Sequence, residues 1–133
     1  MLLVKTKIGP SDIEGTGLFA DEFIPKGTII WKYQDGFDHK YDVADIAKLS
    51  ESAKAQFLKY TYFDTDIKKY ILCFDDARFF NHSDTPNCDS EDSSEGADGL
   101  TIANRDIQPG EELLCDYGEF DSGNNTTIVS ANE

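Results

Sequence analysis

Apolar residues in this 133-residue chain occur in short runs that turn-forming residues interrupt. The runs have four to seven residues, which is the usual length of a strand, and they are rich in β-branched and aromatic side chains. Turns built on Pro and Gly lie between them. The predicted strands are residues 28–31, 70–74, 100–103 and 111–117. This pattern predicts a mainly β chain.

One longer segment, residues 42–60, has a different pattern. Val43, Ile46 and Phe57 are among its apolar residues, which recur mostly at helical spacing, and neither Gly nor Pro interrupts the segment. We therefore predict one helical region here, either continuous or broken near Ser50. The chain is then strand, helix, strand in order.

Residues 20–28 and 103–111 resemble each other weakly. Their matches lie at a constant offset of 83 residues and are Ala20 with Ala103, Ile24 with Ile107, and Gly27 with Gly110. If the likeness is structural, two similar β-turn-β units flank the inserted helical region.

The charge of the chain is strongly negative and unevenly placed. The sequence has 26 acidic and 12 basic residues, for a formal charge of −14. From Phe79 onward there are 13 acidic residues and one basic residue, Arg105. Phosphate neutralisation needs clustered Lys and Arg, so general nucleic-acid binding is excluded. The asymmetry indicates a positively charged partner, with solubility alone as the other interpretation.

Length and composition fit one folded domain, because 39% of the residues are hydrophobic. We expect this domain to span residues 1–120, with the helical region at about 42–62 and a polar tail at 121–133. Residues 90–99, rich in Ser, Gly and acidic side chains, are expected to form a solvated loop or hairpin tip. No apolar run approaches the roughly 18 residues that cross a bilayer. A soluble intracellular protein is therefore expected.

The three cysteines are Cys73, Cys88 and Cys115, and they contain no Cys-x-x-Cys pair. An odd number without such a pair favours neither a disulfide framework nor a zinc cluster. We expect buried free thiols and no metal site.

Three segments carry side chains that are typical of catalytic or ligand-binding sites. Residues 15–17 read Gly-Thr-Gly, residues 78–88 read Arg-Phe-Phe-Asn-His-Ser-Asp-Thr-Pro-Asn-Cys, and residues 110–117 read Gly-Glu-Glu-Leu-Leu-Cys-Asp-Tyr. In this order they resemble the SET-domain protein-lysine methyltransferases, over roughly residues 5–120. The length resembles the minimal SET proteins of viruses and bacteria, which carry the catalytic domain without targeting modules.

The resemblance implies a mainly β (α+β) fold of several small antiparallel sheets, β-clip-like, around an inserted helical segment. The C-terminal segment of this fold threads beneath a loop as a pseudoknot. The implied reaction moves methyl groups from S-adenosylmethionine to the ε-amine of lysine, leaving S-adenosylhomocysteine, with no metal. The implied substrate is a basic protein, such as a histone tail or another lysine-rich protein, with no direct nucleic-acid or membrane binding. A monomer and a homodimer both remain open. The expected location is the cytoplasm, or the nucleus, including a host nucleus for a viral protein.

The resemblance also implies roles for individual residues. The cofactor-binding residues that it implies are Gly15, Thr16, Gly17, Asn81, His82, Tyr117 and Phe120. Tyr117 is in addition the implied catalytic residue, at the mouth of a narrow channel that joins cofactor and substrate lysine. The residues expected to line that channel are Tyr60, Tyr62, Ser90 and Cys115.

The chain departs from many nuclear members of the family in two ways. No cysteine follows Cys115 in the sequence, so a zinc-binding post-SET segment is not expected and Cys88 is expected to be a free thiol. Family members that limit the number of methyl groups carry an aromatic residue at the positions of Ser90 or Cys115. Neither residue is aromatic here, so di- or trimethylation is expected.

Other functions fit the sequence less well. A SET-like module that binds basic tails with little catalysis is the main alternative. The acidic residues at 84–98 lack the glycine and glutamate frame of an EF-hand calcium loop. A Ser-His hydrolase is disfavoured because His82 and Ser83 are adjacent, which leaves only His39 as another histidine base.

Replacing Tyr117 with Phe is expected to abolish or strongly reduce methyl transfer while leaving cofactor binding intact, because only the hydroxyl that orients the amine is lost. A methylation assay and a cofactor-binding measurement on the same variant test this. Unchanged turnover would contradict the role of Tyr117.

Overall fold

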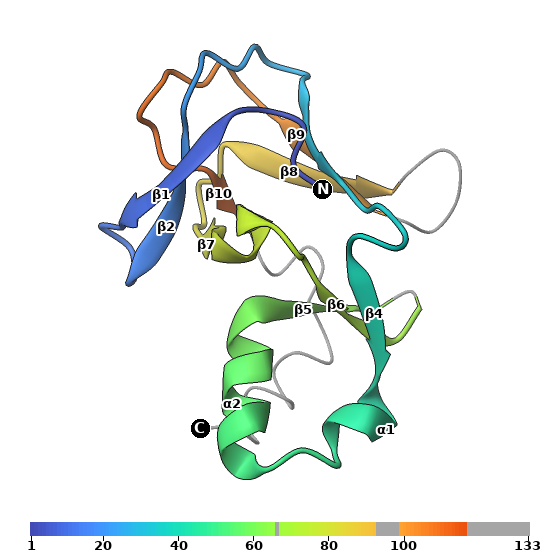
Figure 1. Cartoon of the computed structure of the whole chain (residues 1–133). Helices are drawn as coiled ribbons and strands as arrows, with labels where there is room; N and C mark the ends of the chain where they lie inside the picture. Colours follow the sequence, from blue (N-terminus) through green and yellow to red (C-terminus); the bar gives the residue numbers. More distant parts are fainter. Residues whose placement is uncertain (66, 93–98, 117–133) are drawn as a thin grey trace.

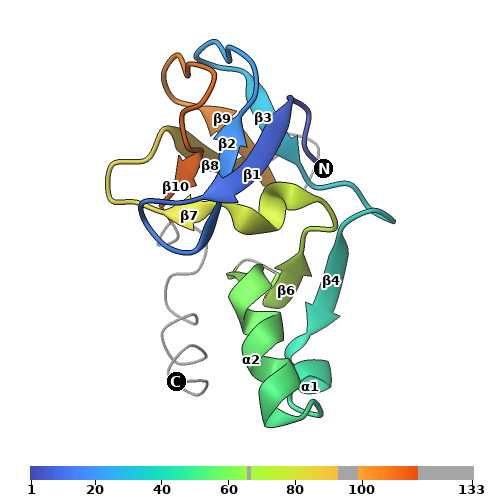
Figure 2. The same ribbon diagram turned by 60° about the vertical axis from the view of Figure 1, so that its left-hand side comes forward.

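The structure is a computed structural model of the chain, and it describes all residues except 66, 93–98 and 117–133. Short strands dominate, so the predicted mainly β class is confirmed. Figure 1 shows most strands gathered at one end of the molecule and the two α-helices at the other. Figure 2 shows the same division after a 60° turn.

The first two strands, β1 (Thr6–Pro10) and β2 (Thr16–Ala20), form an antiparallel hairpin. The loop that joins them closes through a hydrogen bond of 2.8 Å from Ser11 N to Gly15 O. Gly15 has φ +50°, in the left-handed region that glycine adopts without strain. This loop, residues 11–15, is called the hairpin loop below.

A five-stranded sheet follows in the order β3, β9, β8, β10, β7. The strands are β3 (Ile29–Lys32), β7 (Asn81–His82), β8 (Cys88–Asp92), β9 (Gly99–Ala103) and β10 (Leu114–Cys115). Strands β8 and β9 form an antiparallel pair. The loop predicted at residues 90–99 is therefore strand at both of its described ends, and residues 93–98 lie outside the description.

Strand β10 lies between β7 and β8 and is parallel to both. The other strand pairs are antiparallel, so β10 is the parallel exception in the mostly antiparallel sheets that were expected. Strands β7 and β8 are joined by residues 83–87, so the C-terminal strand occupies a place between two strands that are connected to each other. This arrangement matches the predicted threading. The predicted strand at 111–117 is shorter because residues 111–113 hydrogen-bond to β2 instead.

The side chain of Asn87 fixes the chain where it enters β10. Its Nδ2 donates to Glu112 O at 2.8 Å, and its Oδ1 accepts from Leu114 N at 2.9 Å. Asn87 is 2% exposed, and its own carbonyl accepts from Asn104 N at 3.0 Å. One buried amide thus replaces the strand partner that residues 112–114 would otherwise lack.

The helical end consists of two helices and a three-stranded antiparallel sheet in the order β4, β6, β5. Its elements are β4 (His39–Asp42), α1 (Val43–Ile46), α2 (Glu51–Tyr60), β5 (Thr61–Asp64) and β6 (Lys69–Leu72). The helical region predicted at 42–60 is two helices that are separated near Ser50, which confirms the broken alternative over the continuous one. Ser50 caps α2 by accepting from Ala53 N at 3.1 Å.

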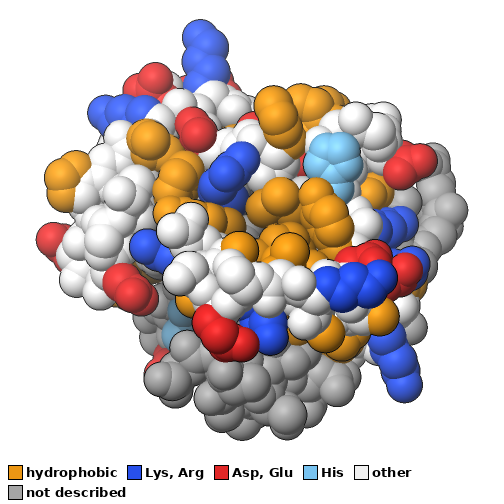
Figure 3. Space-filling model, turned by 60° about the horizontal axis from the view of Figure 1, so that its bottom comes forward, with side chains coloured by type: hydrophobic (Ala, Val, Ile, Leu, Met, Phe, Trp, Pro, Cys, Tyr) orange, Lys and Arg blue, Asp and Glu red, His pale blue; other side chains and the backbone are white. Residues whose placement is uncertain are grey.

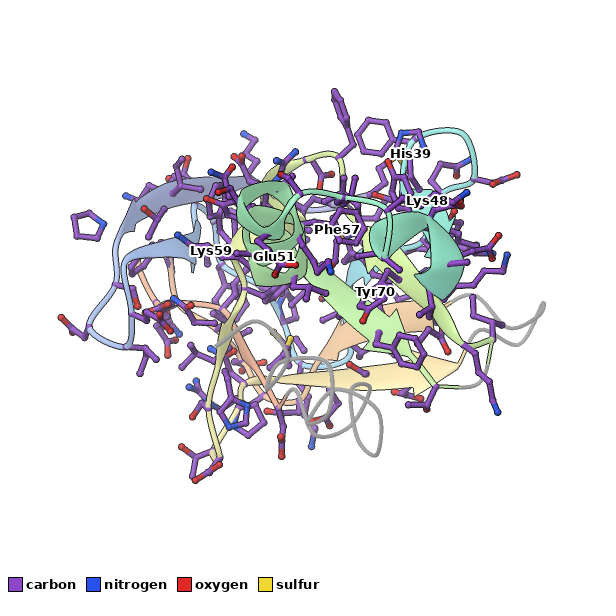
Figure 4. All side chains as sticks on the ribbon, turned by 90° about the horizontal axis from the view of Figure 1, so that it is seen from below. His39, Lys48, Glu51, Phe57, Lys59 and Tyr70 are labelled. Atoms are coloured by element: carbon purple, nitrogen blue, oxygen red, sulfur yellow. The ribbon has the colours of Figure 1, made fainter. Side chains whose placement is uncertain are left out.

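Helix α2 packs on the small sheet through Phe57. Its ring lies 5.7 Å from the ring of Tyr70 and 5.1 Å from that of Tyr41. Figure 4 shows Phe57 directed toward Tyr70 of β6, with Lys59 on the other side of α2. No residue of α2 is fully buried, and Figure 3 shows charged and apolar side chains interspersed at this end of the molecule. One edge of α2 therefore stays available to border a cavity.

The two weakly similar segments pair with each other. Ile24 N donates to Ile107 O at 2.9 Å, and Ile107 N donates to Ile24 O at 2.8 Å. Gly27 N donates to Ala103 O and Gly110 N to Ala20 O, both at 2.8 Å. Gly27 and Gly110 have nearly equal φ values, +89° and +91°. The likeness in sequence thus reflects a local two-fold arrangement of hydrogen bonds.

The largest core cluster lies where β2, β8, β9 and the residues around β10 meet. Its members are Leu18, Ala20, Ile24, Ile30, Cys88, Ala103, Ile107, Leu113 and Cys115. All three cysteines are buried free thiols, as predicted. Among the described residues, no helix has the length and apolar character that crossing a membrane requires.

Replacing Asn87 with Ala is expected to lower the free energy of unfolding by about 3 kcal/mol, because two backbone groups would lose their buried partner. Urea denaturation followed by circular dichroism measures this. The exposed Gln56 of α2, replaced with Ala, is the control and should change stability by less than about 0.5 kcal/mol. Equal effects of the two variants would contradict the role of Asn87.

Candidate active site

The hairpin loop is held by the hydroxyl of Ser11. Its Oγ accepts from Ile13 N at 2.9 Å and from Glu14 N at 3.3 Å, and it donates to the carboxylate of Glu112 at 2.8 Å. Because Ser11 thereby uses both its lone pairs and its proton, the loop conformation depends on a residue near β10.

Asn81 joins the same network from β7. Its Nδ2 lies 2.9 Å from Glu112 Oε2, 3.1 Å from Ser11 Oγ and 3.1 Å from Glu14 O. The amide nitrogen is therefore engaged by the protein. It ties the first residue of β7 to the hairpin loop.

A cavity of about 440 Å³ lies between the hairpin loop and β7, and we call it the loop cavity. Residues 13–16 form one wall, and residues 78–82 form another. The end of α2 contributes Lys59 and Tyr60. A volume of this size lies within the range of small-molecule sites.

A second cavity, of about 310 Å³, lies between the end of α2, β5 and the β8–β9 pair, and we call it the strand cavity. Residues from several elements line it, among them Trp31, Tyr62, Ser90, Thr101 and Cys115. Two acidic side chains, Asp64 and Glu91, also line it. The strand cavity thus combines aromatic walls with acidic side chains and, from Lys59 and Arg78, basic ones.

The two cavities share a wall. The residues that line both are Lys59, Tyr60, Arg78 and Phe80. The ring of Tyr60 packs edge-to-face on Phe79 with the ring centroids 5.9 Å apart. Two cations flank this ring, with Lys59 Nζ 5.5 Å and Arg78 Cζ 5.9 Å from its centroid. Aromatic rings and positive charge therefore separate the loop cavity from the strand cavity.

His82 marks the outer edge of the loop cavity. Its Nε2 lies 3.2 Å from Asp84 Oδ1, and its Nδ1 lies 3.7 Å from Asp116 Oδ1. The side chain of His82 is 44% exposed. These contacts bring Asp116, the last described residue before Tyr117, next to the loop cavity. Among the described residues, no three His, Cys, Asp or Glu side chains converge as a metal site.

Comparison with known proteins identifies the fold and the family. The family model of the SET domain matches residues 15–118. The chain belongs to the SET-domain family. It is 35% identical over 114 residues to the Histone-lysine N-methyltransferase trr of Drosophila melanogaster, and the match covers 84% of this chain but only 5% of that relative. A solved structure from Plasmodium falciparum, of a proposed histone methyltransferase, is similar with a TM-score of 0.60 at 24% identity. This match covers 88% of the present chain and 96% of the other, and at this identity it supports the fold alone.

The structure brings the predicted SET site residues together in two groups. The loop cavity is lined by Gly15, Thr16, Asn81 and His82. The strand cavity is lined by Tyr60, Tyr62, Ser90 and Cys115. Their roles stay predictions, and so do those of Tyr117 and Phe120, which lie outside the described residues.

Gly17 is the one predicted residue that lies elsewhere. It is not part of the lining of the loop cavity. A Cβ at Gly17 would lie 2.9 Å from Glu112 Cδ and 3.0 Å from Ser11 Cβ, so a larger residue there would have to displace the Glu112 side chain. Gly17 thus packs against Glu112 and Ser11, and the predicted approach of its backbone to the cofactor stays a prediction.

Several residues of this SET site were not predicted to have a role. Lys59 borders both cavities, and Ser11 and Glu112 fix the hairpin loop. Glu112 belongs to the Gly-Glu-Glu-Leu string, and its place in that motif is a signal from which a role could have been predicted. Ser11 and Lys59 have no signal in the sequence, because their roles depend on contacts with distant segments.

Cys73, which lines the strand cavity, is expected to react slowly with iodoacetamide. Burial raises the pKa of its thiol above the usual range, and the nearby carboxylate of Asp38 adds to this effect. Since the thiolate is the nucleophile, alkylation at pH 8 should be slower than in the unfolded chain by on the order of tenfold or more. Peptide mass spectrometry over a time course measures the rate. Equal rates in folded and unfolded protein would refute the expectation.

Proposed function

We propose that this SET domain transfers methyl groups from S-adenosylmethionine to the ε-amine of lysine in a basic protein. The observation that carries the proposal is the pair of cavities with a common wall. One holds the residues that the family resemblance assigns to the cofactor, and the other holds those assigned to the lysine channel. Methyl transfer needs donor and acceptor to meet end to end from opposite sides.

The residues around the loop cavity fit S-adenosylmethionine. Its amino-acid part carries a carboxylate, and Lys59 and Arg78 are the cations in this lining. Apolar side chains for an adenine ring are present as Ile13, Phe79 and Phe80. At Gly15 an added Cβ would meet nothing within 4 Å, so the backbone there is open to close approach by a ligand.

The protein's contribution to the reaction is alignment and control of one proton. The cofactor supplies a methyl group on a positively charged sulfur. A lysine with a pKa of about 10.4 is protonated at pH 7, and presenting it as the neutral amine costs about 4.6 kcal/mol. The cations Lys59 and Arg78 and the ring of Tyr60 border the point where the cavities meet. Positive charge and an apolar wall both disfavour the ammonium form there.

The strand cavity is suited to a basic substrate. Asp64 and Glu91 line it, and the sequence from Phe79 onward carries nearly all of the net negative charge. The acidic groups of the lining attract a lysine ammonium, while the cations of the common wall favour its loss of a proton. The name of the Drosophila relative makes histones the first substrates to test.

The test is a methylation assay with labelled S-adenosylmethionine and a panel of basic proteins that includes histones. We expect label on lysine of at least one of them, with di- or trimethyl product, because Ser90 and Cys115 add no aromatic ring to the strand cavity. We also expect the KM for the basic protein to rise with salt.

Mass spectrometry maps the modified lysine and counts its methyl groups. Binding of a basic protein without any transfer would contradict the proposal and favour the alternative of a binding module. Monomethyl product alone would overturn the expected methylation state while leaving the proposed reaction in place.

A further inference from the structure

The carboxylate of Glu112 lies at a junction of three segments that are far apart in the sequence. Both of its oxygens lie 2.8 Å from Ser11 Oγ in the hairpin loop, and Oε2 also lies 2.9 Å from Asn81 Nδ2 in β7. Ser11 and Asn81 are separated from Glu112 by 101 and 31 residues. One side chain thus joins the two walls of the loop cavity.

The backbone of Glu112 is held as firmly as its side chain. Its carbonyl accepts from Asn87 Nδ2 at 2.8 Å, and the next residue, Leu113, donates its N–H to Leu18 O at 2.7 Å. Glu112 also forms a bridge with Phe19 of β2. The carboxylate is therefore presented from a fixed main chain, which allows it to set the position of more loosely held groups.

Gly17 provides independent support, because its missing side chain makes room for this carboxylate. A Cβ built on Gly17 would overlap Glu112 Oε2. In contrast, Gly15 in the same Gly-Thr-Gly string is open on that side. The second glycine of the string therefore admits Glu112, whereas the first borders the loop cavity.

Ser11 connects the Glu112 carboxylate to the backbone of the hairpin loop. Three N–H groups lie within hydrogen-bond distance of its Oγ, those of Ile13, Glu14 and Asn81 Nδ2. A hydroxyl oxygen has only two lone pairs, so these groups saturate it as an acceptor; its proton is left to be donated, and Glu112 is the acceptor. A glutamine at position 112 would place an N–H group against Ser11 Oγ and Asn81 Nδ2. Neither atom has a lone pair free to accept a hydrogen bond from it.

We propose that Glu112 is the positioning residue of the cofactor site. It acts through Ser11 and Asn81, and it holds the hairpin loop and β7 at the separation that the cofactor requires. The identity of the ligand in this inference rests on the proposed function. The positioning role rests on the contacts described above. Glu112 does not line the loop cavity, so it does not touch the ligand.

The test compares Glu112→Gln with Glu111→Gln, a matched change at the adjacent carboxylate. Glu111 instead accepts from Gln108 N at 2.6 Å and from Arg105 at 3.1 Å, within its own turn. We expect Glu112→Gln to weaken binding of S-adenosylhomocysteine at least tenfold in calorimetry, and Glu111→Gln to change it less than twofold. Circular dichroism at the measuring temperature confirms that both variants are folded.

Hydrogen exchange in the protein without cofactor is the second readout. In Glu112→Gln the amides of Ile13 and Glu14 should exchange at least tenfold faster than in the original protein, while the amides of the β8–β9 pair should not change. Unchanged exchange at Ile13 and Glu14 would overturn the proposal. Equal acceleration at all of these amides would overturn it too, since that result indicates general destabilisation.

A double-mutant cycle with Gly17→Ala isolates the contact. Alone, Gly17→Ala should weaken cofactor binding at least fivefold, because the new methyl group displaces the carboxylate. In the Glu112→Ala background the same change should cost less than twofold. Additive effects would contradict the proposal. If the original protein binds no S-adenosylhomocysteine, the proposed function fails, and the exchange experiment still decides whether Glu112 sets the loop.

Discussion

The structure depends on the insertion of β10 between β7 and β8. This strand is only Leu114–Cys115, too short to hold its place by ladder hydrogen bonds alone. The buried amide of Asn87 supplies the missing partners on one side, and β2 supplies them for residues 111–113. Because residues 83–87 connect β7 to β8, threading β10 between these strands draws three distant parts of the sequence to one place.

Two cavities with one common wall follow from that threading. Strand β7 borders the loop cavity, while Cys115 of β10 and Ser90 of β8 border the strand cavity. The end of α2 closes both with Tyr60, which two cations flank. Charged side chains of both signs border the strand cavity. Acidic groups line it, and basic groups lie where the two cavities meet. This arrangement suits a lysine side chain that binds as the charged ammonium and reacts as the neutral amine.

The sequence predicted what depends on neighbours along the chain. Short apolar runs indicated four of the ten described strands, and a break near Ser50 was one of two alternatives because the cap there is local. The motif strings indicated Gly15, Thr16, Asn81, His82 and Cys115 as site residues, because the members of each string lie close together in the sequence. The parallel pairing of β10 and the bond between Ser11 and Glu112 depend on segments up to 101 residues apart, so no local pattern encodes them. The close approach of Gly17 to Glu112 was not predicted for the same reason, because the two residues are far apart in the sequence.

The most direct test of the account is a crystal structure of the protein with S-adenosylhomocysteine and a lysine-containing peptide from a modified substrate. The account predicts the cofactor product between the hairpin loop and β7. It predicts the lysine side chain in the strand cavity, with its amine directed at the sulfur across the wall that contains Tyr60. A structure with both ligands in one cavity, or with the lysine outside the strand cavity, would contradict the account.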